Sequence, residues 1–182
     1  MRSIPEKKFR SQTEGILQLL FDWVAALVMA LAVLITLFIF LFRVVVVDGD
    51  SMQTTLYDKD RLVLWTVGYH PEQGDIVVVD RYTEDPLIKR VIGLAGDTVK
   101  VTEDAVYVNG IRLEEPYVDA NFPNIPNGIE VTVPEGHVFV MGDHRNNSSD
   151  SRSEHIGCVR EENLVGKVVF RIFPFSAIGG VE

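Results

Sequence analysis

The stretch "DTVKVTEDAVYVNGIRL", from Asp97 to Leu113, decides the fold class of this chain. Its valines alternate with polar residues, which is the period-two pattern of a half-buried β-strand. Asn109-Gly110 interrupts the second half of the stretch, and Asn-Gly is the strongest short signal for a tight hairpin turn. The stretch therefore predicts three strands in succession, joined by two turns.

Similar strand patterns surround this stretch on both sides. They lie in 61–69, in 75–80, in "HVFVMGD" (137–143) and in "GKVVFRIFPF" (166–175), and turn residues separate them. No long amphipathic helix is predicted after Phe42. The part of the chain after Phe42 is therefore expected to be mainly β, an antiparallel barrel or a sandwich-like domain.

A proline-rich segment, "EEPYVDANFPNIPNG" (114–128), interrupts this series of strands. Its three prolines and its length predict a long irregular connection. A mobile surface connection is the simpler interpretation of this segment, and a functional lid is the alternative.

The run "WVAALVMALAVLITLFIFLF", from Trp23 to Phe42, contains no charged residue. About 20 apolar residues match the thickness of a bilayer core. A cleaved signal peptide has a shorter apolar region followed by small residues, whereas Ala30-Leu31-Ala32 lies inside this run. A buried helix of a soluble protein is the other alternative, but this run is apolar on all faces and its length matches the bilayer. We therefore expect a transmembrane helix over 20–43.

The charges on either side of this run predict its orientation. Four basic and two acidic residues precede Leu20, whereas 12 basic and 23 acidic residues follow Arg43. Basic flanks remain in the cytoplasm. The expected organisation is a cytoplasmic segment over 1–19 and an extracytoplasmic domain over 44–182 at the plasma membrane. The strong acidity of that domain argues against a nucleic-acid partner.

Cysteine and histidine usage gives no sign of a metal or another cofactor. Cys158 is the single cysteine, so no intramolecular disulfide can form, and a small buried hydrophobic side chain is its expected role. No pair of the four histidines has the helical spacing of a zinc site. A Ser-His-Asp triad remains open, because its members need not be close in sequence.

Two residues are candidates for a nucleophile and its base. Ser51 follows an apolar run in "VVVVDGDSMQTTL" (44–56), without a Gly-x-Ser-x-Gly elbow or a neighbouring histidine. Lys89 lies in "DPLIKRVIGLAGD" (85–97), where strand alternation places Lys89 and Arg90 on opposite faces. Burial would lower the pKa of Lys89 toward the range of a general base. The alternatives are a simple turn serine and a lysine whose amine reaches water.

A third motif, "GDHRNNSSDSR" (142–152), is dense in hydrogen-bonding groups and follows an apolar strand. A solvated loop is one interpretation of this motif. The other is a polar site in which Asp150 and Arg152 pair with the region of Arg90, and a serine hydroxyl orients the lysine amine.

These three motifs, in this order behind a membrane span, resemble the type I signal peptidases of the short single-span kind typical of Gram-positive bacteria. The resemblance implies a serine endopeptidase with a Ser-Lys dyad, in which Ser51 is the nucleophile and Lys89 is the general base. It assigns Ser148 to the orientation of the lysine. Arg90, Asp150 and Arg152 match a structural polar cluster beside the site.

The resemblance also implies how a substrate is held. The backbone of Ser51 and Gly49 would form the oxyanion site, and the substrate groove would be bordered by Met52, Val47, Leu87 and Ile88. Thr54 stands where the family often has a proline, which fixes φ. Gly49 stands where some relatives have a serine that helps to bind the oxyanion.

The implied partners are secretory precursor proteins with their signal peptides, and the phospholipid membrane. Phe173 and Phe175 in "RIFPFSA" (171–177) are candidates for contact with the membrane interface, or simply for the core. Two other classes of protein fit parts of the pattern. One is a self-cleaving repressor-like protease with the same chemistry, and the other is a membrane-anchored module that binds precursors without cutting them.

Overall fold

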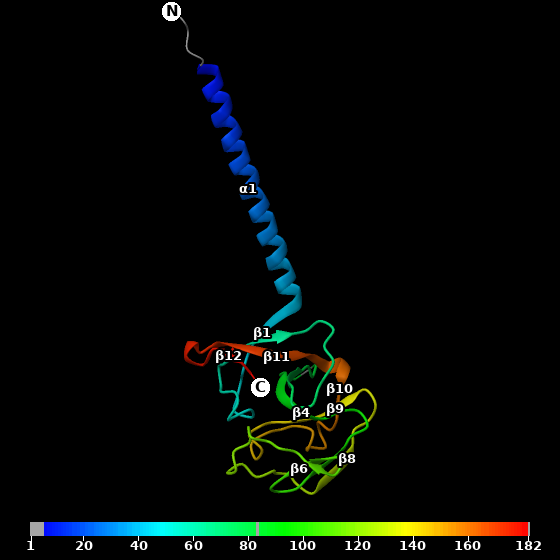
Figure 1. Cartoon of the computed structure of the whole chain (residues 1–182). Coiled ribbons are helices and arrows are strands. Elements are labelled where there is room, and N and C mark those ends of the chain that lie inside the picture. The colour runs from blue at the N-terminus through cyan, green and yellow to red at the C-terminus, as the bar shows by residue number, and fades with distance from the viewer. Residues whose placement is uncertain (1–5, 83, 182) are drawn as a thin grey trace, which may run out of the picture. The chain divides into compact units, whose positions relative to one another are not determined.

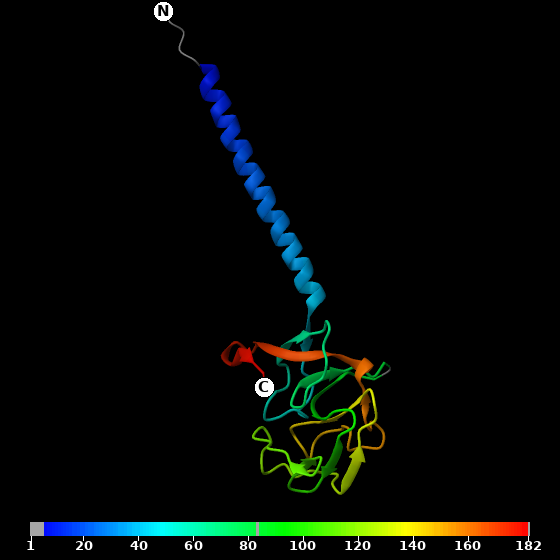
Figure 2. The ribbon, with the colours of Figure 1, turned by 45° about the vertical axis from the view of Figure 1, so that its right-hand side comes forward.

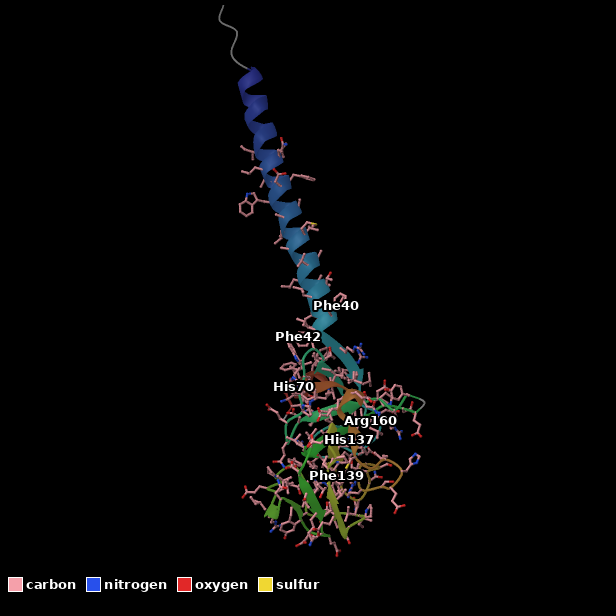
Figure 3. All side chains as sticks on the ribbon, turned by 90° about the vertical axis from the view of Figure 1, so that its right-hand side faces the viewer. Phe40, Phe42, His70, His137, Phe139 and Arg160 are labelled. Atoms are coloured by element: carbon pink, nitrogen blue, oxygen red, sulfur yellow. The ribbon has the colours of Figure 1, made fainter. Side chains whose placement is uncertain are left out.

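The computed structural model describes residues 6–82 and 84–181, which form two compact units that meet in sequence between Leu41 and Phe42. The first unit is one helix, α1 (Glu6–Leu41). Its section from Gly15 to Leu41 is long and apolar enough to cross a membrane. Large apolar side chains such as Phe40 are exposed along it (Figure 3). The helix ends before Phe42 and Arg43, which were expected in the span but begin the first strand.

Strands are the main regular elements of the second unit, and turns and irregular segments connect them (Figure 1). The strands are β1 (Phe42–Val46), β2 (Arg61–Trp65), β3 (Ile76–Val79), β4 (Leu87–Gly93), β5 (Thr98–Val101), β6 (Val106–Val108), β7 (Ile111–Arg112), β8 (Ile129–Thr132), β9 (His137–Met141), β10 (Val159–Arg160), β11 (Leu164–Phe173) and β12 (Gly179–Gly180). The helical segments of its described part are two short 3₁₀ turns, Glu161–Asn163 and Phe175–Ala177. The expected mainly β class is confirmed.

The strands form two antiparallel sheets. The larger has the order β1-β2-β11-β3-β4-β9-β10, with β12 paired to β11, and the smaller has the order β7-β6-β5-β8. In Figure 2 the long β11 crosses one end of this unit, and the smaller sheet lies at the other end. Within the described residues β1 and β10 do not pair with each other, so the larger sheet is curled but open.

The hairpin predicted from Asn109-Gly110 is present between β6 and β7. Asn109 has φ 53° and Gly110 has φ 80°, and both central residues of a type I′ turn need positive φ. Val108 pairs with Ile111 across this turn. The Asn-Gly signal therefore predicted this turn correctly.

The core lies on both faces of the larger sheet. In β3 all four residues are buried: Ile76 and Val78 pack into one apolar cluster, whereas Val77 and Val79 pack into another. A third cluster joins the two sheets, where Phe139 packs with Val99, Val101, Val106 and Val133 (Figure 3). Strands buried on both faces are rigid supports, and β4 is held between two of them, β3 and β9.

Among the described residues, two strands of the larger sheet, β1 and the first half of β4, each have one edge without a paired strand, and residues of both line the same groove. β1 is the outermost strand and pairs with β2. Leu87, Ile88 and Lys89 of β4 pair with β3 on one side, whereas the pairing of β4 with β9 begins at Arg90. The first half of β4 therefore has one side on which its backbone can bind another extended segment.

Candidate active site

Ser51 lies in a tight turn that follows β1. The amides of Thr55 and Leu56 donate to the Met52 carbonyl, at 2.9 and 2.8 Å. Met52 and Leu56 are buried in the apolar cluster under the turn, with exposed fractions of 1% and 0%. These two apolar side chains anchor the turn, and the more accessible Ser51 side chain is presented at its surface.

Lys89 lies on β4 and its amine contacts the serine. The Nζ atom donates to Ser51 Oγ at 2.6 Å, and the lysine is only 2% exposed. Burial lowers the pKa of Lys89 to about 8, while the nearby Asp150 carboxylate partly opposes this change. A pKa near 8 leaves roughly one molecule in five with a neutral amine at pH 7.4. The pair thus has the geometry and the charge of a nucleophile and its base.

Asp150 is the centre of a buried group of polar side chains beside the lysine. It accepts hydrogen bonds from Ser148 Oγ (2.6 Å), from the Gly142 amide (2.9 Å) and from both Nε and Nη2 of Arg152 (2.8 Å each). Burial opposes ionisation, but Arg152 and these hydrogen bonds hold the pKa of Asp150 below its usual value. Asp150 is therefore a fixed negative charge near the amine.

Ser148 was predicted to orient the lysine. Among the described residues, its hydroxyl donates to Asp150, and the Lys89 amine donates to Ser51. The side chain of Ser148 lies against Gly142, and the Ser51 carbonyl lies there too: a Cβ at Gly142 would meet both within 2.4 Å. Ser148 is thus brought to the site, and its influence on Lys89 through Asp150 remains a prediction.

The polar motif suggested that Asp150 and Arg152 pair with the region of Arg90, whereas Arg90 forms its ion pair with Asp143 and Arg152 forms its ion pair with Asp150. Arg90 Nε and Nη2 donate to the two oxygens of Asp143, at 3.0 and 2.8 Å, and this pair is buried. Asp143 also accepts from Thr55 Oγ1 at 2.5 Å. The polar cluster therefore contains two separate buried ion pairs, Arg90 with Asp143 and Arg152 with Asp150. Asp143 stood in the quoted motif, but its role depends on the pairing of β4 with β9.

The backbone amides near Ser51 differ in their availability. Gly49 has φ 94°, and its N–H donates to Asp58 Oδ1 at 3.0 Å, so this amide is occupied. Within the described residues the Ser51 N–H has no acceptor. An oxyanion would therefore be bound by the Ser51 amide, whereas Gly49 supplies a turn conformation that favours glycine.

A groove of about 520 Å³ runs from Ser51 and Lys89 between β1 and the first half of β4. All four residues predicted to border a substrate groove line it: Val47, Met52, Leu87 and Ile88. Further apolar residues of its wall are Val44, Val45, Val46, Val78, Pro86 and Val165. The nucleophile is therefore at one part of a largely aliphatic groove with open strand edges on two sides.

In the part of the chain that the structure describes, no histidine contacts Ser51 Oγ, so a Ser-His-Asp triad is not assembled there. The histidine that contacts the turn is His144, whose amide donates to the Ser51 carbonyl at 3.1 Å and whose Nδ1 lies 3.2 Å from the Asp50 carbonyl. Neither contact involves Ser51 Oγ. His137 contacts the Glu135 carbonyl through Nδ1 at 2.8 Å, and His155 Nε2 lies 3.5 Å from Glu84 Oε1. Burial raises the pKa of the Cys158 thiol, which disfavours a thiolate nucleophile.

Comparison with known proteins agrees with this geometry. Residues 20–173 match the family described as signal peptidase, peptidase S26. The chain belongs to this family. Signal peptidase I of Bacillus licheniformis is 39% identical over 171 residues, which cover 87% of this chain and 91% of that one. Signal peptidase IB of Staphylococcus aureus (strain N315) is 34% identical over 176 residues, or 86% and 91%.

A solved structure is also similar. A crystal structure of a signal peptidase I from Enterococcus faecalis V583 is 31% identical, with a TM-score of 0.46, and the match covers 54% of this chain and 97% of that one.

In this family member, several residues at the site were missed by sequence reasoning. Tyr117 and Phe122 belong to the proline-rich segment, and both contact residues of the site: the Tyr117 ring lies 3.8 Å from the Arg90 guanidinium carbon, and Phe122 stacks on His144. Aromatic residues in an otherwise polar and proline-rich loop were the available signal. The segment is a surface connection, as the simpler interpretation expected, and its Tyr117 and Phe122 also contact residues of the site.

Proposed function

We propose that this chain is a membrane-bound serine endopeptidase that removes N-terminal signal peptides from secreted precursors with a Ser-Lys dyad. The observation that carries the proposal is the 2.6 Å hydrogen bond between the buried Lys89 amine and Ser51 Oγ, in a chain of the signal peptidase family. The names of the relatives support the substrate class.

The chemistry follows from the two side chains. A neutral Lys89 amine accepts the hydroxyl proton of Ser51, and Oγ attacks the scissile carbonyl of the precursor. The Ser51 N–H donates to the oxyanion that forms. The protonated Lys89 then donates to the leaving amine, which departs with the mature protein. Water attacks the acyl-enzyme by the same route, with Lys89 again as the base, and releases the signal peptide.

The groove is suited to an extended segment of the precursor. An added strand can bind the open edges of β1 and of the first half of β4 through backbone hydrogen bonds. Its alternate side chains then point toward the aliphatic wall. This arrangement agrees with the small residues that the family resemblance implies at three and one positions before the cut.

The first unit supports membrane attachment. Gly15–Leu41 is long and apolar enough to span a bilayer, and the basic residues before it favour a cytoplasmic amino terminus. Ser51 follows Leu41 by ten residues, so the chain alone limits their separation to about 35 Å. Phe173 and Phe175 are 40% and 79% exposed, which supports contact with the interface more than a role in the core.

Cleavage of a precursor in trans tests the function. The full chain in detergent is incubated with a precursor that bears a signal peptide, and mass spectrometry identifies the new amino terminus. We expect one cut directly after the signal peptide, and no cut with Ser51→Ala. The control Ser153→Ala, in the loop after Arg152, should cleave at the wild-type rate.

The same assay separates the two other classes of protein. A module that only holds precursors would bind the substrate and leave it intact with the wild-type chain. A self-cleaving protease would cut its own chain and leave the precursor intact. Either result would contradict the proposed function.

A further inference from the structure

Arg145, which is 1% exposed, holds the proline-rich segment 114–128 at two points, Glu115 and Asn124. Arg145 forms an ion pair with Glu115, and its Nη1 donates to Asn124 Oδ1 at 3.1 Å. Asn124 is itself buried, and its amide and Nδ2 donate to the carbonyls of Glu103 and Thr102, both at 2.8 Å. These two points of the segment are therefore tied to the 142–152 loop and to the turn between β5 and β6.

Between these anchors, Tyr117 contacts two sides of the site. Its carbonyl accepts a hydrogen bond from Thr54 Oγ1 at 2.8 Å. Its ring covers the guanidinium group of Arg90, which is paired with Asp143. Thr54 is three residues after Ser51, at the position where the family often has a proline. The hydroxyl thus gives the nucleophile turn a tether that a proline side chain lacks.

Phe122 contacts the other side of the turn through His144. The two rings stack with their centroids 3.9 Å apart and an interplanar angle of 21°. The His144 amide donates to the Ser51 carbonyl, and Nδ1 donates to the Asp50 carbonyl in the tautomer that carries its proton there. These two carbonyls flank the Ser51 N–H, so the position of His144 bears on the direction of that amide.

We propose that the segment acts as a strap, defined by Glu115, Tyr117, Phe122 and Asn124, whose residues position the Ser51 turn for the reaction. This inference rests on the proposed function. The strap holds the turn through Thr54 on one side and through His144 on the other. A displacement of about 1 Å in a reacting group can cost about a hundredfold in rate, so a few modest contacts suffice to matter.

Two substitutions release the strap without touching the reacting atoms. Thr54→Val keeps the shape of the side chain and removes the hydroxyl, and Phe122→Leu removes the ring from His144. One neutral hydrogen bond or one ring contact corresponds to roughly a three- to tenfold change in rate. We expect each variant to lower kcat by that factor with KM within about twofold, because the substrate groove is unchanged. Thr54→Ser, which retains the hydroxyl, should restore kcat.

Two control variants remove comparable side-chain groups at positions that do not contact the Ser51 turn. Thr132→Val removes an exposed hydrogen bond to Thr98 on the smaller sheet, and Ile125→Ala truncates an exposed residue of the same segment. Both should keep the wild-type kcat. The double variant Thr54→Val/Phe122→Leu should have a kcat only slightly below that of the more impaired single variant, because either release frees the same turn.

A second measurement does not depend on catalysis. Amide hydrogen exchange in the peptide that covers 48–57 should be faster in Thr54→Val and Phe122→Leu, and unchanged in the two controls. All four variants should have the thermal unfolding midpoint of the wild type.

Wild-type kcat and wild-type exchange in both strap variants would overturn the strap and leave the proposed peptidase intact, provided that Ser51→Ala is inactive. A loss confined to KM would overturn it too, and so would a double variant whose loss is the product of the two single losses. If the wild-type chain cuts no precursor, the proposed function fails, and the exchange result alone decides whether the strap holds the turn.

Discussion

The amine of Lys89 lies 2.6 Å from Ser51 Oγ. Lys89 is only 2% exposed, and this burial has two measurable consequences. It lowers the pKa from 10.5 to about 8, which makes the neutral base available near physiological pH. It also destabilises the folded chain whenever the amine is protonated, because the charged form is poorly solvated there.

The first consequence is a pH dependence of catalysis. We expect kcat/KM to rise about tenfold per pH unit below pH 8 and to become constant above it, because the reaction needs the neutral amine. Precursor cleavage measured over a range of buffers gives this profile. A rise centred near the ordinary pKa of histidine, about 6.5, would show that another base acts.

The second consequence concerns stability. Because the pKa of Lys89 is lower in the folded state, the wild-type chain gains stability as the pH rises from about 8 to 10.5. Lys89→Met removes the protonated amine and should stabilise the chain by about 3 kcal/mol below pH 8, a gain that disappears toward pH 10.5. Chemical denaturation of the second unit measures it, with the exposed Lys100→Met as control. An equal gain at all pH values would contradict the assignment.

Ser148 is expected to act on Lys89 through Asp150. Without its hydroxyl, Asp150 loses one hydrogen bond, and its negative charge acts more strongly on the amine. Ser148→Ala should therefore raise the pKa of Lys89, so that the acid side of the activity profile moves to higher pH while kcat falls. The pH profile distinguishes this role from a purely structural one, which would lower kcat without moving the profile.

At the scale of elements, β4 is the strand that organises the site. Its alternation places Lys89 against Ser51 and Arg90 against Asp143, while neighbouring residues of both faces are buried in the core. A single strand buried on both faces thus holds the base of the reaction and one ion pair in fixed positions relative to each other.

The ion pair of Arg90 allows a test of this arrangement. Asp143→Ala leaves a buried guanidinium without its carboxylate and should lower the free energy of unfolding by about 3–5 kcal/mol. The exposed pair of Lys100 and Glu130 supplies the control, because Glu130→Ala should change it by less than about 1 kcal/mol. Urea unfolding measures both. Arg90 Nη1 also donates to the Gly74 carbonyl at 2.8 Å, so a small effect of Asp143→Ala would mean that this hydrogen bond and the Tyr117 ring suffice to hold Arg90.

Local signals in the sequence predicted the elements well, and long-range pairing was the limit. Asn109-Gly110 predicts its hairpin because two residues determine the turn, and the alternation around Lys89 predicts opposite faces for Lys89 and Arg90. The partner of Arg90 depends on the register between β4 and β9, which are about fifty residues apart. The docking of segment 114–128 depends on Arg145 and Asn124, and no local pattern contains that information.

At the scale of the whole molecule, the chain combines a candidate membrane span with an aromatic surface on the second unit. Phe173 and Phe175 lie edge to face, and the Arg61 guanidinium lies 5.5 Å from the Phe173 ring centre. Aromatic and basic side chains are typical of the membrane interface. This composition suits contact with lipid head groups.

The variant Phe173→Ser/Phe175→Ser tests that contact. We expect slower cleavage of a precursor embedded in vesicles and an unchanged rate for a short soluble peptide, because the groove is not altered. If the variant and the wild type cleave the vesicle substrate at the same rate, Phe173 and Phe175 do not contribute a functional membrane contact. A loss on the soluble peptide would show that they stabilise the fold.

The central claim is that Ser51 and Lys89 act as one catalytic unit, and a double-mutant cycle on precursor cleavage tests it most directly. The full chain is compared with Ser51→Ala, Lys89→Ala and the combined variant, and circular dichroism confirms the fold of each. Residues that act as a unit are not additive, so each single variant and the double variant should lose the same factor, at least about a thousandfold. Near wild-type cleavage by either single variant, or a double loss equal to the product of the single losses, would contradict the dyad.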